Sequence, residues 1–205
     1  MSIDTLIIDF GKVLCDSSWS RVMAGICNIK PGLTKSDIYD FVFPRFLDYE
    51  RGRYGRIEFW SMIEKEMNID VGLPPGEFLS ECYKRILLDY NEDVIRILEE
   101  VRDSGIRCCL LSNACEEISA SVLNDERLRA IFEDRMYFSN AIGERKPHPE
   151  AYLAVLNGAE CKAENALFVD DLQRNVDGAI DVGIKAVVFT DAWHLRMDLR
   201  DHGLL

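Results

Sequence analysis

Three acidic residues stand at the ends of two apolar runs that are far apart in the sequence. Asp9 ends the run 5–9, and Asp170 and Asp171 follow the run 166–169. If the two runs are neighbouring parallel strands, these carboxylates meet at the edge of the sheet where open α/β folds bind ligands. Like charges that close repel each other unless a cation or a proton intervenes. The pattern therefore predicts a hard divalent metal such as Mg²⁺, and chemistry on an anionic substrate.

Two further motifs carry groups suited to binding phosphate oxygens. Ser112 and Asn113 end the apolar run 107–112, and their hydroxyl and amide can donate hydrogen bonds to a phosphoryl oxygen. The same residues could instead cap a following helix. Lys146 lies in the sequence Lys-Pro-His-Pro, where the prolines fix its backbone. Its charge could neutralise a phosphate and Asp9 together, or it could be a solvated loop lysine.

Continuous apolar runs predict the strands that would position these groups. We expect five strands, at 5–9, 107–112, 136–139, 166–170 and 185–190. Unbroken rather than alternating apolar character is typical of parallel strands that are covered on both faces. Helical patterns alternate with them at 91–104, 116–123, 150–157 and 175–182. This alternation of strands and helices predicts a doubly wound, Rossmann-like α/β fold.

The segment between the first strand and the helix at 91 contains no clear strand. Helical patterns run over 17–27, 34–49, 56–67 and 75–89, and Thr34 with Asp37 forms a capping-box sequence. We therefore expect an α/β core from residues 1–14 and 91–205. Residues 15–90 would form a helical cap over the carboxyl edge of the sheet.

Composition limits the classes of function. The chain has 205 residues and a net charge of −12, so it lacks the basic surplus that nucleic-acid binding needs, and we expect no such partner. No apolar stretch approaches the ~20 residues of a membrane helix, so no membrane association is expected. Seven cysteines without CxxC spacing, and no signal-peptide pattern, favour reduced thiols and a cytoplasmic location. The sequence does not predict the oligomeric state.

Taken together, the order, spacing and strand placement of these motifs resemble the haloacid dehalogenase-like hydrolase superfamily over essentially the whole chain. The stretch 146–152 is similar to that family's K-P-x-P-x-x-Y pattern, and 171–175 fits its D-x-x-x-N continuation. The resemblance implies the strand order 5-4-1-2-3, which puts the strands of Asp9 and Asp170 side by side. It also implies that the helical insertion is a cap of the C1 type.

The motifs then take roles in catalysis and substrate binding. By the resemblance, Asp9 is the nucleophile that forms an aspartyl-phosphate, and Ser112 and Lys146 hold the phosphoryl oxygens. Asn113, beside Ser112, is a further candidate for substrate binding. Arg21, early in the insertion, could reach a substrate anion or form a salt bridge on the cap surface. The expected partner is a small phosphorylated substrate.

The metal site that the resemblance implies departs from the family's usual pattern at one position. Asp9, the carbonyl of Gly11 and Asp170 would hold Mg²⁺, with Asp171 acting through water or Lys146. Most phosphatases of the superfamily carry an acid–base Asp where this chain has Gly11. The pattern D-x-G-x-V-L resembles a subgroup that includes sugar-phosphate phosphatases of the glucose-1-phosphate type. Since an acid–base residue contributes ~10²–10⁴-fold, we expect slow turnover unless another group takes its place.

The replacement for the missing acid and the activity itself both have alternatives. Asp16, Glu50 and His148 are candidates for the acid–base role. A metal-free 2-haloacid dehalogenase would share the nucleophile, but the pair Asp170-Asp171 argues against a site without metal. A catalytically weakened phosphate-binding or regulatory protein is a second alternative. An epoxide-hydrolase-type or sugar phosphomutase relative is a third, and Gly11 fits a mutase poorly because acid–base catalysis is central to that reaction.

Overall fold

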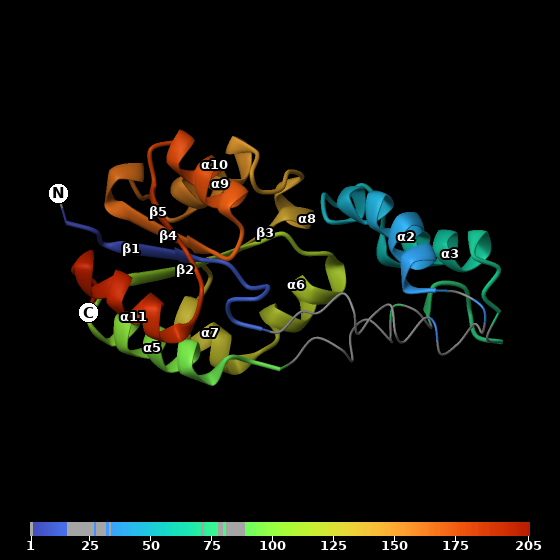
Figure 1. Ribbon diagram of the computed structural model, residues 1–205, viewed down its shortest axis with the longest axis horizontal. Helices are drawn as coiled ribbons and strands as arrows, with labels where there is room; N and C mark the ends of the chain where they lie inside the picture. Colours follow the sequence, from blue (N-terminus) through green and yellow to red (C-terminus); the bar gives the residue numbers. More distant parts are fainter. Residues whose placement is uncertain are drawn as a thin grey trace.

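The computed structural model describes residues 2–15, 27, 32, 34–70, 72–77, 80 and 89–205. At its centre lies a parallel sheet of five strands in the order β3-β2-β1-β4-β5 (Figure 1). The strands are β1 (Thr5–Ile8), β2 (Arg107–Ser112), β3 (Met136–Phe138), β4 (Ala166–Asp170) and β5 (Lys185–Val188). Counted from the opposite edge this is the order 5-4-1-2-3, so the predicted doubly wound, Rossmann-like sheet is confirmed.

The register of the three central strands brings the acidic residues together. Ile8, the last residue of β1, pairs with Leu110 of β2 and with Val169 of β4. Asp9 directly follows Ile8, and Asp170 directly follows Val169. The backbone amide of Asp9 donates to the Val169 carbonyl at 2.9 Å. The two carboxylates therefore leave the sheet side by side at its carboxyl edge.

Helices cover both faces of the sheet. On one face lie α5 (Glu92–Asp103), α6 (Glu116–Leu123), α7 (Glu126–Phe132) and α11 (Ala192–Asp201). On the other lie α9 (Pro149–Gly158) and α10 (Gln173–Asp181), while α8 (Ser139–Ile142) follows β3 and a 3₁₀ turn (Ala163–Asn165) precedes β4. Leu6 and Ile8 of β1 belong to the first apolar layer and Ile7 to the second. Burial on both faces explains the unbroken apolar sequence of β1.

Helix α5 shows how local sequence sets an element of the core. The Asn91 side chain caps its first turn by accepting from the Val94 amide at 3.3 Å. Val94, Leu98 and Val101 recur at helical spacing and are fully buried, which stabilises the fold by about 1.5–3 kcal/mol for each side chain. Gly105 follows the last turn with φ +88°, a conformation that glycine adopts without strain.

The other predicted elements agree with the structure to within two residues at their ends, but the sequence does not predict α7, α8 and α11. Helix α11 buries only Leu195 and Leu199 among its ten residues, so its sequence shows no strong helical pattern of apolar residues. Helix α8 has four residues, too few for any periodic pattern. None of the helices in the described part of the chain is long and apolar enough to cross a bilayer.

The described part of the inserted segment forms α2 (Lys35–Tyr49) and α3 (Arg56–Glu66), close to two of the predicted helices. Thr34 and Asp37 form the predicted capping box at the start of α2. Figure 1 shows both helices beyond the carboxyl ends of β1 and β2. They pack through buried aromatic rings: Phe46, Tyr49, Phe59 and Trp60. Of the predicted helix at 17–27 only residue 27 is described, and of the one at 75–89 only residues 75–77, 80 and 89.

Candidate active site

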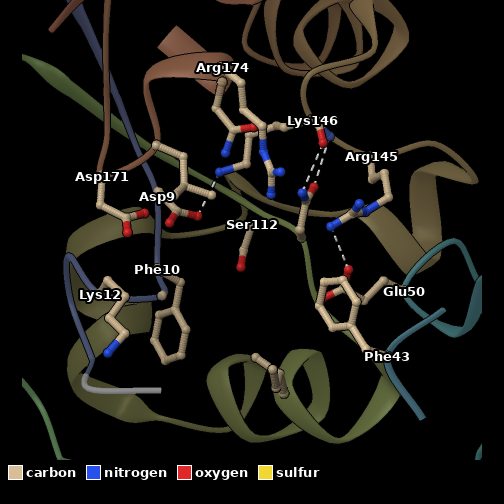
Figure 2. Close-up of a pocket in the computed structure, with 15 residues that line it drawn as sticks. Asp9, Phe10, Lys12, Phe43, Glu50, Ser112, Arg145, Lys146, Asp171 and Arg174 are labelled. Atoms are coloured by element: carbon tan, nitrogen blue, oxygen red, sulfur yellow. Dashed lines mark hydrogen bonds and ion pairs between the residues drawn. The ribbon is translucent and has the colours of Figure 1, made fainter. Parts of the chain in front are cut away.

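A cavity of about 300 Å³ opens at the carboxyl edge of the sheet, next to α2 (Figure 2). It is lined by residues from the strand ends, from the loop before α9, from α6 and α10, and from α2 and the residue that follows it: Asp9, Phe10, Gly11, Lys12, Phe43, Glu50, Ser112, Asn113, Ile118, Arg145, Lys146, Asp171, Leu172, Arg174 and Asn175. The four sequence motifs, separated by up to 160 residues, therefore meet in one pocket.

Lys146 is the centre of a buried polar network with Asp9 and Asp170, which we call the pocket floor. Its Nζ lies 2.6 Å from Asp9 Oδ1 and 2.7 Å from Asp170 Oδ2, and it donates to the Leu111 carbonyl at 2.8 Å. The side chain is only 1% exposed. Burial alone lowers the pKa of Lys146, but the two carboxylates outweigh burial and raise the pKa above its ordinary value. Lys146 is thus a fixed, buried cation and not a solvated loop lysine.

Asp9 occupies an environment that disfavours its charge despite this lysine. Burial raises the pKa of Asp9 to about 7; Lys146 opposes the shift and Asp170 adds to it. Such a carboxyl group is ready to bind either a proton or a cation near neutral pH. When Asp9 and Asp170 are both ionised, the single charge of Lys146 leaves the floor with a net negative charge. A further positive charge would balance it.

The two consecutive aspartates after β4 differ in what they contact. Asp170 is fully buried and accepts from the Leu172 amide at 2.9 Å and from Asn175 Nδ2 at 2.9 and 3.0 Å, in addition to its contact with Lys146. Asp171 is half-buried and lines the pocket. Burial, followed by the charge of Asp170, raises the pKa of Asp171. Asp170 therefore orients the lysine, and Asp171 faces the cavity.

The acidic residues of the floor fit a divalent metal. Asp9, Asp170 and Asp171 each offer a carboxylate oxygen, and these oxygens all lie within 4.8 Å of one another. Oxygen ligands of this kind suit Mg²⁺. Gly11 also lines the pocket, where its lack of a side chain leaves the backbone accessible. No cluster of histidines or cysteines in the described ranges offers a competing metal site.

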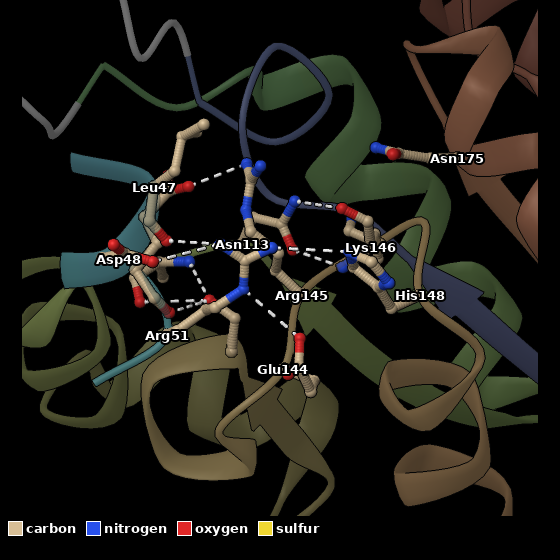
Figure 3. A network of polar contacts seen from close by, with 12 residues as sticks. Leu47, Asp48, Arg51, Asn113, Glu144, Arg145, Lys146, His148 and Asn175 are labelled. Atoms are coloured by element: carbon tan, nitrogen blue, oxygen red, sulfur yellow. Dashed lines mark hydrogen bonds and ion pairs between the residues drawn. The ribbon is translucent and has the colours of Figure 1, made fainter. Parts of the chain in front are cut away.

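Ser112 and Asn113 have different surroundings although they are neighbours. Ser112 is 3% exposed at the end of β2, and Figure 2 shows its hydroxyl directed toward the cavity. The Asn113 amide binds the backbone of Lys146, donating to its carbonyl at 3.0 Å and accepting from its amide at 2.8 Å (Figure 3). Helix α6 begins after Cys115, so neither residue is its cap. Asn113 holds the lysine loop in place.

The remaining predicted residues are distributed unevenly around the pocket. Of the acid–base candidates, Glu50 lines the cavity, whereas His148 lies outside it beside Arg51, with the two nitrogens 3.4 Å apart (Figure 3). Asp16 and the substrate-binding candidate Arg21 both lie outside the described residues.

Several pocket residues are not identified by the sequence motifs. Arg145 forms an ion pair with Glu50 at 2.8 Å, and burial raises the pKa of Glu50 although Arg145 opposes the shift (Figure 2). Phe43 of α2 lines the cavity and stacks on Tyr39, with the ring centroids 4.7 Å apart. Arg174 precedes Asn175 in the first turn of α10. Arg145 and Arg174 each stand next to a motif residue in the sequence, Lys146 and Asn175. This is the one local signal that could have identified them.

Known proteins with similar sequences and structures have related folds and related names. The family model described as haloacid dehalogenase-like hydrolase matches residues 74–189. A phosphatase of Mycobacterium tuberculosis is 34% identical, over 91% of this chain and 87% of its own length. The GMP/IMP nucleotidase of Escherichia coli is 25% identical, over 89% of this chain and 81% of its own length.

Solved structures agree with this assignment at the level of the fold. A haloacid dehalogenase-family enzyme of Bacteroides thetaiotaomicron superposes with a TM-score of 0.82 at 23% identity, covering 96% of this chain and 99% of that one. The same enzyme has been solved in complex with magnesium and inorganic phosphate, with a TM-score of 0.79 at 24% identity, covering 95% and 99% of the two chains. The sheet order, the strand-end motifs and these matches together show that the chain belongs to the haloacid dehalogenase-like hydrolases, among relatives that are phosphatases.

Proposed function

We propose that the protein is a Mg²⁺-dependent hydrolase of small phosphate monoesters that works through a phosphorylated Asp9. The observation that carries this proposal is the floor of the pocket, where Asp9 shares one buried lysine with Asp170 while Asp171 faces the cavity. The phosphatase names of the relatives support the reaction class. The complex of a structural neighbour with magnesium and phosphate supports the cofactor.

Within this proposal, Asp9, Asp171 and the carbonyl of Gly11 would hold the ion. Mg²⁺ bound there would neutralise negative charge on the phosphoryl group and on Asp9. Asp170 would take the positioning role, because both of its oxygens already accept hydrogen bonds from Lys146, Asn175 or the Leu172 amide. This reverses the roles of the two aspartates that the family resemblance implies.

The protein's own residues supply the remaining chemistry. The Asp9 carboxylate attacks phosphorus, a P–O bond forms to the carboxylate, and the bond to the leaving alcohol breaks. Lys146 and Ser112 bind the oxygens of the transferred group from the buried side of the pocket. Water then attacks phosphorus and releases phosphate and free Asp9. Gly11 donates no proton to the leaving alcohol, so esters with acidic leaving groups should react fastest.

We further propose that residues 15–90 act as a cap domain over the core of residues 1–14 and 91–205. Support comes from Phe43 of α2 and from Glu50, the residue that follows this helix, because both line the pocket. The ion pair between Glu50 and Arg145 joins the insertion to the core at this wall. Substrate selection would then depend on side chains of both parts.

The proposal is tested by assaying hydrolysis of an aryl phosphate with Mg²⁺ and with EDTA. We expect turnover with Mg²⁺, its loss in EDTA, and its loss in Asp9→Asn. Asp4→Asn is the matched control, because Asp4 pairs with Arg107 outside the pocket. Chloride release from a 2-chloro acid in EDTA, without phosphate release in Mg²⁺, would instead identify a dehalogenase.

A further inference from the structure

The charged side chains of the pocket are mostly paired with each other. Lys146 is paired with Asp9 and Asp170, and Arg145 is paired with Glu50. Arg174 differs: in the described ranges of the chain, it has no ion pair and no hydrogen bond to its side chain. Figure 2 shows its side chain directed into the cavity. A guanidinium without a protein partner is available to a ligand.

The backbone that carries Arg174 is fixed. The next residue, Asn175, donates to Asp170, and its carbonyl accepts from the Tyr152 hydroxyl at 2.6 Å. Later in α10, Gly178 packs so closely on Pro147 that an added Cβ would lie 2.7 Å from the Pro147 carbonyl oxygen. The first turn of α10 is thus anchored both to the strand end and to the loop of Lys146. Only the side chain of Arg174 remains to adjust to a ligand.

Depth separates Arg174 from the groups on the floor. Lys146 and Ser112 are 1% and 3% exposed, whereas Arg174 is exposed at the mouth of the cavity, near Leu172. A phosphoryl group that reaches Asp9 occupies the floor. The alcohol part of the ester would then extend toward the mouth, where Arg174 lines the cavity.

We propose that Arg174 is a specificity residue that binds a second anionic group, of the carboxylate class, on the alcohol part of the substrate. The inference rests on the proposed phosphatase function and names the substrate class within it. A guanidinium presents parallel N–H donors that match the two oxygens of a carboxylate, and charge-assisted pairs of this kind are among the strong hydrogen bonds. The uncharged alcohol of a simple sugar phosphate would leave this group unused.

The test compares esters that differ only in the second anion. 3-Phosphoglycerate is paired with glycerol 3-phosphate, and phosphoglycolate with 2-hydroxyethyl phosphate. The kcat/KM of each is measured for wild type, Arg174→Gln and Arg174→Lys. Arg200→Gln is the control, because it removes an equal charge from an exposed position at the end of α11, away from the pocket. Binding of the same esters to the Asp9→Asn variant by calorimetry gives a readout without turnover.

The wild type should prefer the carboxylate member of each pair. Arg174→Gln should lower kcat/KM for that member by about 10- to 100-fold. It should change kcat/KM for the member without a carboxylate by less than about threefold. Arg174→Lys should recover part of the loss, and Arg200→Gln should match wild type. Equal losses on both members would place Arg174 on the transferred phosphate and overturn the proposal, as would no loss on either. Arg174-dependent binding without hydrolysis of any ester would refute the phosphatase function and leave the inference standing.

Discussion

Lys146 on the pocket floor is fixed by oxygens from the ends of three strands, β1, β2 and β4. On the wall toward the insertion, Glu50 Oε2 forms an ion pair with Arg145 at 2.8 Å, and Arg145 Nε has no hydrogen-bond partner among the described residues. The register of the sheet fixes where the three strand ends lie relative to one another, and this sets the positions of the groups on the floor. On the wall, the Nε–H of Arg145 is therefore still able to donate a hydrogen bond. This difference fits our proposal that the core carries out the reaction and that the wall and mouth select the substrate.

The junction between insertion and core has its own fixed point at Glu117 of α6. This side chain is 1% exposed and accepts from Trp60 Nε1 at 2.6 Å, from Ser80 Oγ at 2.8 Å and from the Tyr49 hydroxyl. All three donors belong to the inserted segment, and none is charged. A core carboxylate therefore holds the insertion in place without contributing to the pocket lining.

Removing the central cation of the floor should have the largest effect. Lys146→Met leaves Asp9 and Asp170 buried without their lysine. We expect kcat/KM to fall by about 10³-fold and the free energy of unfolding to fall by about 3–5 kcal/mol. Turnover and thermal unfolding are measured beside Lys162→Met, a matched change at an exposed position. A variant that keeps wild-type turnover would show that the floor is not organised around Lys146.

Glu117→Ala should affect stability more than chemistry. It leaves the Tyr49, Trp60 and Ser80 donors without their common acceptor, which should cost about 2–4 kcal/mol of unfolding free energy. Chemical denaturation measures the loss, with Glu126→Ala as an exposed control in the first turn of a core helix. Unchanged stability would mean that Glu117 does not hold the insertion to the core.

The close approach of the two parts at Gly52 can be tested with a matched glycine. Gly52 has φ +70°, and an added Cβ would lie 2.3 Å from the Asn140 carbonyl oxygen; Gly72 has φ +68° with nothing within 4 Å. Both alanine variants pay backbone strain of about 1 kcal/mol, and Gly52→Ala adds a steric clash, for a total of about 2–3 kcal/mol. Equal losses in thermal unfolding would show that the junction tolerates the extra atom.

The pH dependence of metal binding should be the smallest effect. Since burial raises the pKa of Asp9 to about 7, protons compete with Mg²⁺ below that pH. The apparent Mg²⁺ affinity should weaken about tenfold for each pH unit below about 7 and level off above about pH 8. Without metal, folded Asp9 binds its proton more tightly than in the unfolded chain, so stability should fall as pH rises from about 4 to 7. Calorimetric titration and thermal unfolding test both trends; an affinity constant over this range contradicts them.

Sequence alone predicts the floor well because its signals are local. The run before Asp9, the run before Asp170 and the helical patterns between them are each visible within a few residues. Parallel pairing of buried strands then requires the two strand ends to lie on one edge. The order of the strands and the meeting of Asp9, Ser112 and Lys146 follow from these features together with the family resemblance.

Features that depend on tertiary contacts escape this reasoning. Glu117 has the sequence signature of an exposed first-turn acid, and its burial results from donors at positions 49, 60 and 80. Asn113 has the donors of a substrate ligand, but the docking of the Lys146 loop engages its amide. Likewise, nothing in the Asp170-Asp171 dipeptide shows which carboxylate turns toward the cavity.

The central claim, that Asp9 becomes phosphorylated, is tested most directly by trapping the intermediate. The protein is mixed with Mg²⁺ and an aryl phosphate, quenched in acid within the first turnover, and its peptides are examined by mass spectrometry. We predict one added phosphoryl group on the peptide that contains Asp9 in wild type and in Asp4→Asn, and none in Asp9→Asn. Rapid hydrolysis without a phosphorylated peptide, or a phosphoryl group on another residue, would contradict the assignment of Asp9 as the nucleophile.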